Sequence, residues 1–141
     1  MRFEILLAFA LAATASAASL SSLPAGVVSV AAMKEYIATT DAELTFVGAP
    51  IGELGINPLL TTVTVCSTAA GNLCSGPCTV LTGSARCFET PDTACLSATT
   101  NIAFCNQAKC KGKCTPLSSC NKYLGDGFCY TPGTRSISLP V

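Results

Sequence analysis

The sequence predicts a small, disulfide-rich, mostly β fold of the α+β type, with one or two short helices. Three observations lead to this prediction. Ten cysteines are concentrated in the C-terminal half of the 141-residue chain. Short runs rich in Thr and Val, separated by Gly and Pro, are typical of strands and turns. An apolar leader begins the chain, which is typical of proteins that form disulfides after export.

The leader has the features of a secretory signal peptide. Arg2 precedes a run of nine apolar residues, 5–13, which is too short to span a bilayer. Ala15-Ser16-Ala17 supplies the small side chains that signal peptidase accepts, which predicts a signal peptide over residues 1–17. Cleavage one residue later, after Ala18, is the alternative. No later apolar run is long enough for a membrane span, so we expect a secreted, extracellular protein.

The remaining chain divides by composition into two parts. Residues 18–65 contain no cysteine and form the predicted N-terminal segment of the mature domain, and residues 66–141 form a disulfide-rich module. A pro-segment is the alternative for 18–65, but no dibasic processing site follows it. This segment carries one basic and four acidic residues, whereas residues 105–141 carry five basic residues and one acidic residue. Neither block has the extended basic surface that nucleic-acid binding requires.

The cysteines read as a framework of five disulfides, because their number is even and they follow a signal peptide. Each bridge typically contributes roughly 2–4 kcal/mol of stability. The spacing leaves the pairing open, since ten cysteines allow roughly nine hundred arrangements. The cysteines are Cys66, Cys74, Cys78, Cys87, Cys95, Cys105, Cys110, Cys114, Cys120 and Cys129.

The sequence contains few of the residues that metal, redox or hydrolytic chemistry requires. The chain has no histidine and no C-x-x-C pair, which disfavours a zinc site, a thioredoxin-like centre and any mechanism that uses a histidine base. Glu89 and Asp92 lie close together between cysteines, where solvated surface is the simpler interpretation. We therefore predict no enzyme, no cofactor and no metal site.

Several elements can be placed from local pattern. Residues 29–38 predict a short helix, with Val30, Met33 and Ile37 on one face that faces the core. Residues 44–47 and the β-branched run 61–65 predict strands, with a loop between them.

The C-terminal half is predicted to alternate between helix and strand. Pro91-Asp92-Thr93 is a candidate cap for a helix over 94–104. Residues 128–131 and 135–139 predict two strands that are joined by a turn at Pro132-Gly133.

A pattern repeated within the cysteine-rich region indicates an internal duplication, with chance similarity as the alternative. The segments 74–79 and 110–115 share C-x-G-x-C-T, and each is followed by a cysteine and an aromatic residue, at 87–88 and 129–130. The shared glycine predicts a backbone with positive φ. The two cysteines of each C-x3-C pair are expected to bond to separate partners.

The candidate binding loop contains Lys109, Lys111 and Lys113. It includes G-x-C-x5-C, a spacing found in disulfide-stabilised antimicrobial peptides, and its three lysines could contact anionic lipid or wall polymer. A solvated turn is the simpler interpretation. A protease-inhibitor loop is another possibility, with Arg86 or one of these lysines as the inserted side chain.

The layout of the whole chain resembles small secreted cysteine-rich proteins of fungi, particularly those of mushroom-forming species. The resemblance lies in the signal peptide, the Ala/Thr-rich apolar segment and the spaced cysteines that end in the run 126–134, DGFCYTPGT. It implies an apoplastic or wall-facing protein and assigns no functional residue. We expect a monomeric, non-enzymatic protein that binds a cell-wall polymer, another organism's surface or a secreted protein. Protease inhibition and antimicrobial action are the alternatives.

Overall fold

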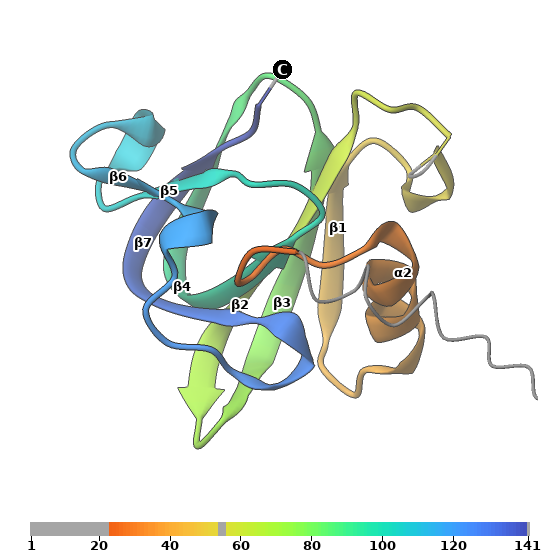
Figure 1. Ribbon diagram of the computed structural model, residues 1–141, viewed down its shortest axis with the longest axis horizontal. Helices are drawn as coiled ribbons and strands as arrows, with labels where there is room; N and C mark the ends of the chain where they lie inside the picture. The colour runs from red at the N-terminus through yellow and green to blue at the C-terminus, as the bar shows by residue number, and fades with distance from the viewer. Residues whose placement is uncertain (1–22, 54–55, 141) are drawn as a thin grey trace, which may run out of the picture.

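The computed structural model describes residues 23–53 and 56–140, which form a seven-stranded sheet with one helix packed against it (Figure 1). The predicted signal peptide lies outside these residues. The strand order is β1-β3-β2-β4-β7-β5-β6, and the mostly β, disulfide-rich fold predicted from the sequence is confirmed. The elements in chain order are α2 (Val30–Thr39), β1 (Leu44–Gly48), β2 (Thr61–Ala70), β3 (Leu73–Gly83), β4 (Cys87–Ala98), β5 (Ala103–Cys105), β6 (Cys114–Pro116) and β7 (Cys129–Ser138). Short 3-10 turns span Ile51–Glu53, Ala108–Cys110, Leu117–Ser119 and Gly125–Gly127.

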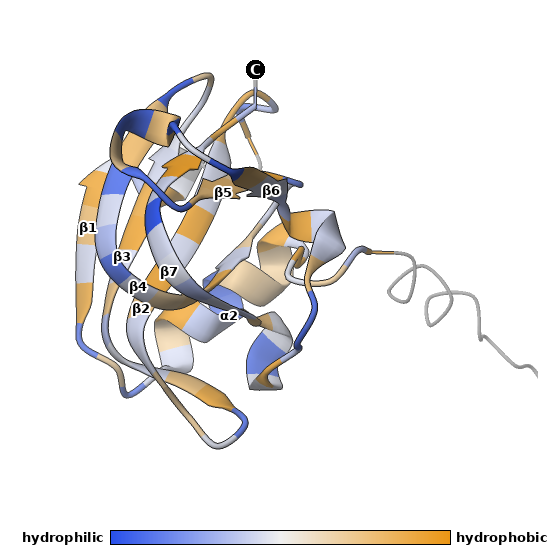
Figure 2. Cartoon of the chain, turned by 90° about the vertical axis from the view of Figure 1, so that its left-hand side faces the viewer, coloured by the Kyte–Doolittle hydropathy of each residue, from blue (hydrophilic) through white to orange (hydrophobic). Residues whose placement is uncertain are grey.

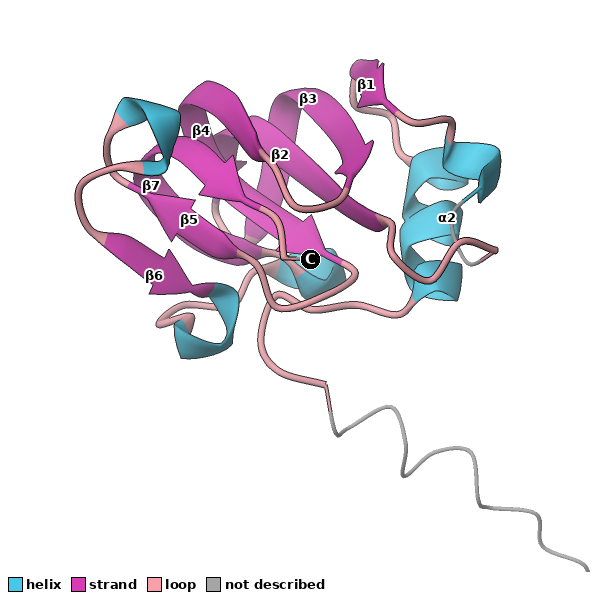
Figure 3. Ribbon diagram, turned by 90° about the horizontal axis from the view of Figure 1, so that it is seen from above, coloured by secondary structure: helices cyan, strands magenta, loops and turns pink. Residues whose placement is uncertain are grey.

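The predicted N-terminal helix is confirmed as α2, which lies at the β1 side of the sheet (Figure 1 and Figure 3). Ser29 caps it, because its hydroxyl oxygen accepts a hydrogen bond from the Ala32 amide at 3.0 Å, which satisfies one of the free amides of the first turn. Met33 points into the protein and is 1% exposed. The Thr64 hydroxyl of β2 donates to the Met33 sulfur at 3.1 Å, so the helix rests on the centre of the sheet.

The cysteine-free segment forms an integral part of the sheet. Both strands predicted in it are present, as β1 and as the first half of β2. β1 pairs in parallel with β3, and β2 lies between β3 and β4, antiparallel to both. Residues 61–66 of β2 are all buried. The segment therefore supplies a central strand, on which the cysteine-rich strands on either side depend.

The helix predicted over 94–104 is wrong. Residues up to Ala98 belong to β4, which is the central strand between β2 and β7. Cys95 and Leu96 are both fully buried, and Cys95 is bonded to Cys74. The apolar residues of 94–104 show no strong helical spacing, and the part of this segment that belongs to β4 pairs with the strands on either side of it instead. Tertiary contacts therefore outweigh local propensity here.

The turn predicted at Pro132-Gly133 is also wrong, because β7 continues through it as one strand. Gly133 has a φ of +81° and forms a bulge that bends the strand rather than reversing it. A matching bulge lies in β4, where Asp92 has a φ of +65°. Thr93 and Thr134 are register partners across the two strands, so the two bulges face each other and bend the sheet at one place.

The two bulges share a sequence and a bonding pattern. Residues 90–93 read T-P-D-T and residues 131–134 read T-P-G-T. In each, the hydroxyl of the last Thr donates to the carbonyl oxygen of the first, at 2.9 Å in the first copy and 2.8 Å in the second. The hydroxyl oxygens of Thr90 and Thr131 are both buried without a hydrogen-bond partner. Two bends of the same chemistry therefore oppose each other at the centre of the sheet.

The strand order has the symmetry that an internal duplication predicts. The order β3-β2-β4 is followed by β7-β5-β6, so that β2, β3 and β4 correspond to β5, β6 and β7 about an axis between β4 and β7. The glycines of the two C-x-G-x-C-T motifs, Gly76 and Gly112, have φ values of +90° and +75°, which confirms the predicted positive φ. A Cβ on Gly76 would lie 2.7 Å from a side-chain oxygen of Thr68, and a Cβ on Gly112 would lie even closer to a side-chain oxygen of Asn106. The two C-x-G-x-C-T motifs thus share a glycine with positive φ and no room for a Cβ.

Two buried clusters lie on opposite faces of the sheet. The larger is aliphatic and aromatic and includes Val63, Leu96, Ile102 and Ile137. The smaller lies near α2 and combines Leu124 and Phe128 with two disulfides. Because sulfur supplies much of this second cluster, its packing depends on oxidation of the cysteines.

Candidate functional site

A groove of about 1060 Å³ lies beside α2, and we call it the α2 groove. One wall is α2 with the loop 40–43 that follows it. The opposite wall is the beginning of β3, residues 73–77, with the turn at 126–127. Segments that are up to about a hundred residues apart in the chain therefore form its two sides. Concave sites of this size are the usual places for ligands.

The lining of the groove is largely aliphatic. Leu23, Val28, Ala32, Leu73 and Pro77 contribute apolar surface, and the Leu23 and Leu73 side chains are 41% and 56% exposed. Solvent-exposed Leu side chains that lie together can gain free energy when a ligand covers them. The groove therefore favours a partner with apolar groups.

The charged residues in the lining are all acidic. Four carboxylates line the groove, from Glu35 on α2, Asp41 and Glu43 on the following loop, and Asp126 on the opposite wall. All four residues are exposed. None of the described residues that line the groove is Lys or Arg. Carboxylates of one sign on both walls of a concavity add their potentials and attract cations.

Disulfides and hydrogen bonds fix the wall that residues 73–77 and 126–127 form. Cys74, on one wall, is bonded to Cys95 of the central strand β4. The Cys120–Cys129 bridge closes the segment that carries the 126–127 turn. The amide of Gly125 donates to the carbonyl oxygen of Asn72 at 2.6 Å, which joins that turn to the start of β3. The wall with α2 carries no disulfide, but the Cys78 amide of β3 donates to the carbonyl oxygen of Glu43 at 2.8 Å, which joins the loop 40–43 to the sheet.

All ten predicted disulfide cysteines are paired, and no cysteine is free. As predicted, each C-x3-C pair bonds to separate partners. The second cysteine of each pair bridges to its register partner on the adjacent strand, and the first bridges to β4. The bridges are Cys66–Cys78, Cys74–Cys95, Cys87–Cys110, Cys105–Cys114 and Cys120–Cys129.

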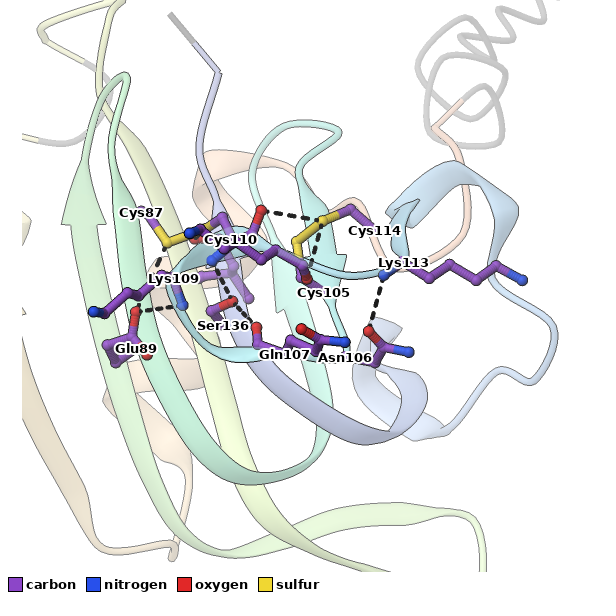
Figure 4. The surroundings of a disulfide bond; sticks show 12 residues. Cys87, Glu89, Cys105, Asn106, Gln107, Lys109, Cys110, Lys113, Cys114 and Ser136 are labelled. Carbon is purple, nitrogen blue, oxygen red and sulfur yellow. Dashed lines mark hydrogen bonds between the residues drawn. A yellow bond between two sulfur atoms is a disulfide. The ribbon is translucent and has the colours of Figure 1, made fainter.

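The candidate lysine loop is a stapled turn between β5 and β6 (Figure 4). The Cys87–Cys110 and Cys105–Cys114 bridges hold it at two points. The Cys110 amide donates to the Ser136 hydroxyl oxygen at 2.8 Å. The amides of Lys109 and Lys113 donate at 2.9 Å to side-chain oxygens of Glu89 and Asn106 respectively. These bonds make the loop rigid.

The three lysines do not form one convergent basic site. Lys109, Lys111 and Lys113 are all exposed, but Lys109 and Lys113 extend to opposite sides of the loop (Figure 4). The carboxylate of Glu89 lies against the Lys109 end and offsets part of the positive charge there. The sequence grouped these lysines by spacing, and the fold separates their side chains.

The basic side chains predicted for an inhibitor loop lie in different settings. The Arg86 guanidinium lies 4.2 Å from the centre of the Phe88 ring, so this side chain packs against its own strand as a cation–π pair. In the lysine loop, Lys109, Cys110 and Gly112 have positive φ, whereas Lys111 has an extended backbone and is exposed.

The described part of the chain also bears on metal and membrane binding. Among residues 23–53 and 56–140, no group of three His, Cys, Asp or Glu side chains is arranged to hold a metal ion. No helix in this part is long and apolar enough to cross a bilayer.

Sequence reasoning missed the α2 groove. The sequence showed that residues 18–65 are acidic, and three of the four groove carboxylates, those of Glu35, Asp41 and Glu43, belong to this segment. Asp126 lies in an otherwise basic part of the chain, and only the packing of the 126–127 turn against the α2 side brings it to the same site.

No family model, curated protein or solved structure matches the chain. The resemblance to fungal small secreted proteins therefore rests on the residues of the chain itself, and the α2 groove has to be interpreted from its own chemistry.

Proposed function

We propose that this protein is a secreted, non-enzymatic binding protein that holds its partner in the α2 groove. The observation that carries the proposal is the combination, in one concavity, of an aliphatic lining with four carboxylates and no basic side chain among the described lining residues. Secretion is supported by the leader at residues 1–17 and by the five disulfides, which form and persist in oxidising surroundings.

The chemistry of the groove selects a segment of another secreted protein that carries apolar side chains and Lys or Arg. Apolar side chains would cover the aliphatic lining, and the cationic groups would lie near the carboxylates of Glu35, Asp41, Glu43 and Asp126. Because disulfides hold the wall formed by residues 73–77 and 126–127, this wall loses little conformational entropy when the partner binds.

A wall polysaccharide, our leading expectation from sequence, receives less support from this site. Sugar rings stack on exposed aromatic faces, and Tyr36 is the one aromatic residue among the described residues of the groove lining. Its ring is half-buried and packs edge-on against Phe128, with ring centres 5.0 Å apart. The divergent lysines of the loop likewise support membrane attack less well than a convergent patch would.

A peptide titration tests the proposal. The probe is a short peptide of alternating Leu and Lys, which is added to the ¹⁵N-labelled protein while amide shifts are followed by NMR. We expect saturable shifts in α2 and in residues 73–77, and weaker binding as salt rises because exposed charges are screened. Peptides with Glu in place of Lys, or with Ser in place of Leu, should bind less tightly.

A matched pair of double variants locates the site. Glu35→Gln with Asp41→Asn should weaken binding of the Leu/Lys peptide by roughly fivefold, since each exposed charge contributes about 0.2–1 kcal/mol. Glu89→Gln with Asp92→Asn removes the same charge away from the groove and should leave the affinity unchanged. Equal losses in both, or a preference for the Leu/Glu peptide, would reject the proposal. Saturable binding of chitin or glucan oligosaccharides at the same amides would reassign the ligand to the wall.

A further inference from the structure

β1 is a margin of the sheet with its outer backbone edge free. Among the described strands it pairs with β3 alone, and in parallel. At one end the Cys78 amide donates to the Glu43 carbonyl oxygen, and at the other the Ala49 amide donates to the Thr82 carbonyl oxygen. Since alternate residues of a strand face alternate neighbours, Thr45 and Val47 bond to β3. The amides and carbonyls of Leu44 and Phe46 therefore face outward.

This edge is apolar on both faces of the sheet. Phe46 and Val47 are 54% and 42% exposed. Phe46 is the register partner of Val80 and Val47 that of Leu81, and both partners are buried. The two exposed side chains thus extend the two buried layers beyond the margin of the sheet. Much of β1 has the colour of hydrophobic residues in Figure 2.

The opposite margin of the same sheet is protected. β6 has three residues and ends at Pro116, which has no amide hydrogen. Lys113 precedes it, and the Cys105–Cys114 bridge ties it to β5. Short length, Pro and Lys are the features by which proteins prevent strand pairing at an edge. β1 contains no charged residue and no Pro. The two margins lie at opposite ends of the sheet (Figure 3).

We propose that β1 pairs with β1 of a second copy, antiparallel and about a two-fold axis at Phe46, to form a dimer with a continuous sheet. In this register the two Phe46 residues exchange their amide–carbonyl hydrogen bonds and place their rings side by side on one face. Leu44 lies opposite Gly48, which has no side chain to obstruct it. This differs from the monomer expected from the sequence. Asp41 and Glu43, which line the α2 groove, lie just before β1 in the chain.

The charges that flank β1 are compatible with this pairing. In the proposed register, Glu43, which directly precedes β1, lies opposite Ala49 of the other copy, and β1 itself contains no charged residue. No carboxylate is placed directly across from another, a juxtaposition that would oppose pairing. The same strand can therefore serve both halves of an isologous interface.

Sedimentation equilibrium of the full secreted protein tests the dimer. We expect the weight-average mass to rise from the monomer toward twice that value as protein concentration increases. Phe46→Lys should hold the protein monomeric over the same range, because it removes the apolar contact and places two cations at the axis. Tyr123→Lys is the matched control: Tyr123 is 65% exposed outside β1, and its replacement should leave association unchanged.

A cross-linking experiment checks the register. Register partners in a hydrogen-bonded antiparallel pair have Cα atoms about 5.5 Å apart, within the range of a disulfide. Phe46→Cys should therefore give an oxidised dimer that reduction separates. Val47→Cys should not, because the two copies of residue 47 are diagonal neighbours roughly 7–8 Å apart. A mass that stays monomeric up to the solubility limit, or a dimer that persists in Phe46→Lys, would overturn the proposal.

Discussion

Single glycines in the cysteine-rich half are constrained in two ways, by their φ angle and by the atoms around them. Gly112 and Gly71 both have positive φ, at +75° and +61°. A Cβ on Gly112 would lie 2.4 Å from the side-chain oxygen of Asn106, whereas a Cβ on Gly71 would meet nothing within 4 Å. A substitution at Gly71 therefore tests backbone strain alone, whereas one at Gly112 tests backbone strain together with steric crowding.

Gly71→Ala should lower the free energy of unfolding by about 1–2 kcal/mol, the usual cost of a left-handed conformation for a residue with a Cβ. Gly112→Ala should lower it further, because Asn106 must move and its hydrogen bond to the Lys113 amide is lost. Guanidinium unfolding with the disulfides intact measures both. Equal decreases in the free energy of unfolding for the two variants would show that Asn106 and the lysine loop can move aside without loss of stability.

Sequence reasoning succeeded at this scale wherever a residue's role is local. Ser29 was placed at the start of the helix, and the glycines of the two C-x-G-x-C-T motifs were assigned positive φ, because caps and tight turns depend on adjacent residues alone. It failed for Lys109 and Lys113, whose directions depend on bonds to Glu89 and Asn106 from elsewhere in the chain.

Among the elements, β4 has the most neighbours that are distant in sequence. It pairs with β2 and β7 and receives two disulfides, at Cys87 and Cys95. No local pattern within 94–104 announces these partners, which is why a helix was predicted there. By contrast, the β-branched run of β2 was recognised because its composition alone is typical of a buried strand.

The disulfides of different elements should contribute unequally to stability. Replacing Cys74 and Cys95 together with Ala should cost about 4–5 kcal/mol, of which about 3 kcal/mol is lost loop constraint and the rest a void in the cluster beneath α2. Cys74 and Cys95 are 9% and 0% exposed. Replacing Cys105 and Cys114 should cost about 2–3 kcal/mol, because Cys114 is exposed. Chemical unfolding of the two double variants compares them, and the reverse ranking would contradict the role given to that cluster.

At the scale of the whole molecule, the strand order is symmetric about an axis between β4 and β7. This symmetry agrees with the internal duplication that the repeated motif indicated. The sequence showed the matching C-x-G-x-C-T segments, but the correspondence of the paired bulges in β4 and β7 became visible only when the strands were placed together. Among the described strands, β1 has no counterpart in this symmetry, since it pairs with β3 at one margin and no strand lies beyond β6 at the other.

The pairing of the cysteines is the most direct test of the whole structure. Intact mass should show no alkylation before reduction and ten alkylated cysteines after it. Peptide mapping of the oxidised protein should recover the five pairs described above and no others. Alkylation of two or more cysteines before reduction would contradict the closed framework and, with it, the sulfur-rich cluster beneath α2.

The order of the bridges along the chain has a consequence for how the protein responds to proteases. The loops closed by Cys66–Cys78, Cys74–Cys95, Cys87–Cys110 and Cys105–Cys114 each overlap the next. Any single peptide bond between Cys66 and Cys114 therefore lies inside at least one covalent ring. A protease that nicks this stretch once releases no fragment, and the two pieces stay tethered in position on the sheet. Damage that would divide an ordinary domain leaves this one in a single covalent unit until its disulfides are reduced.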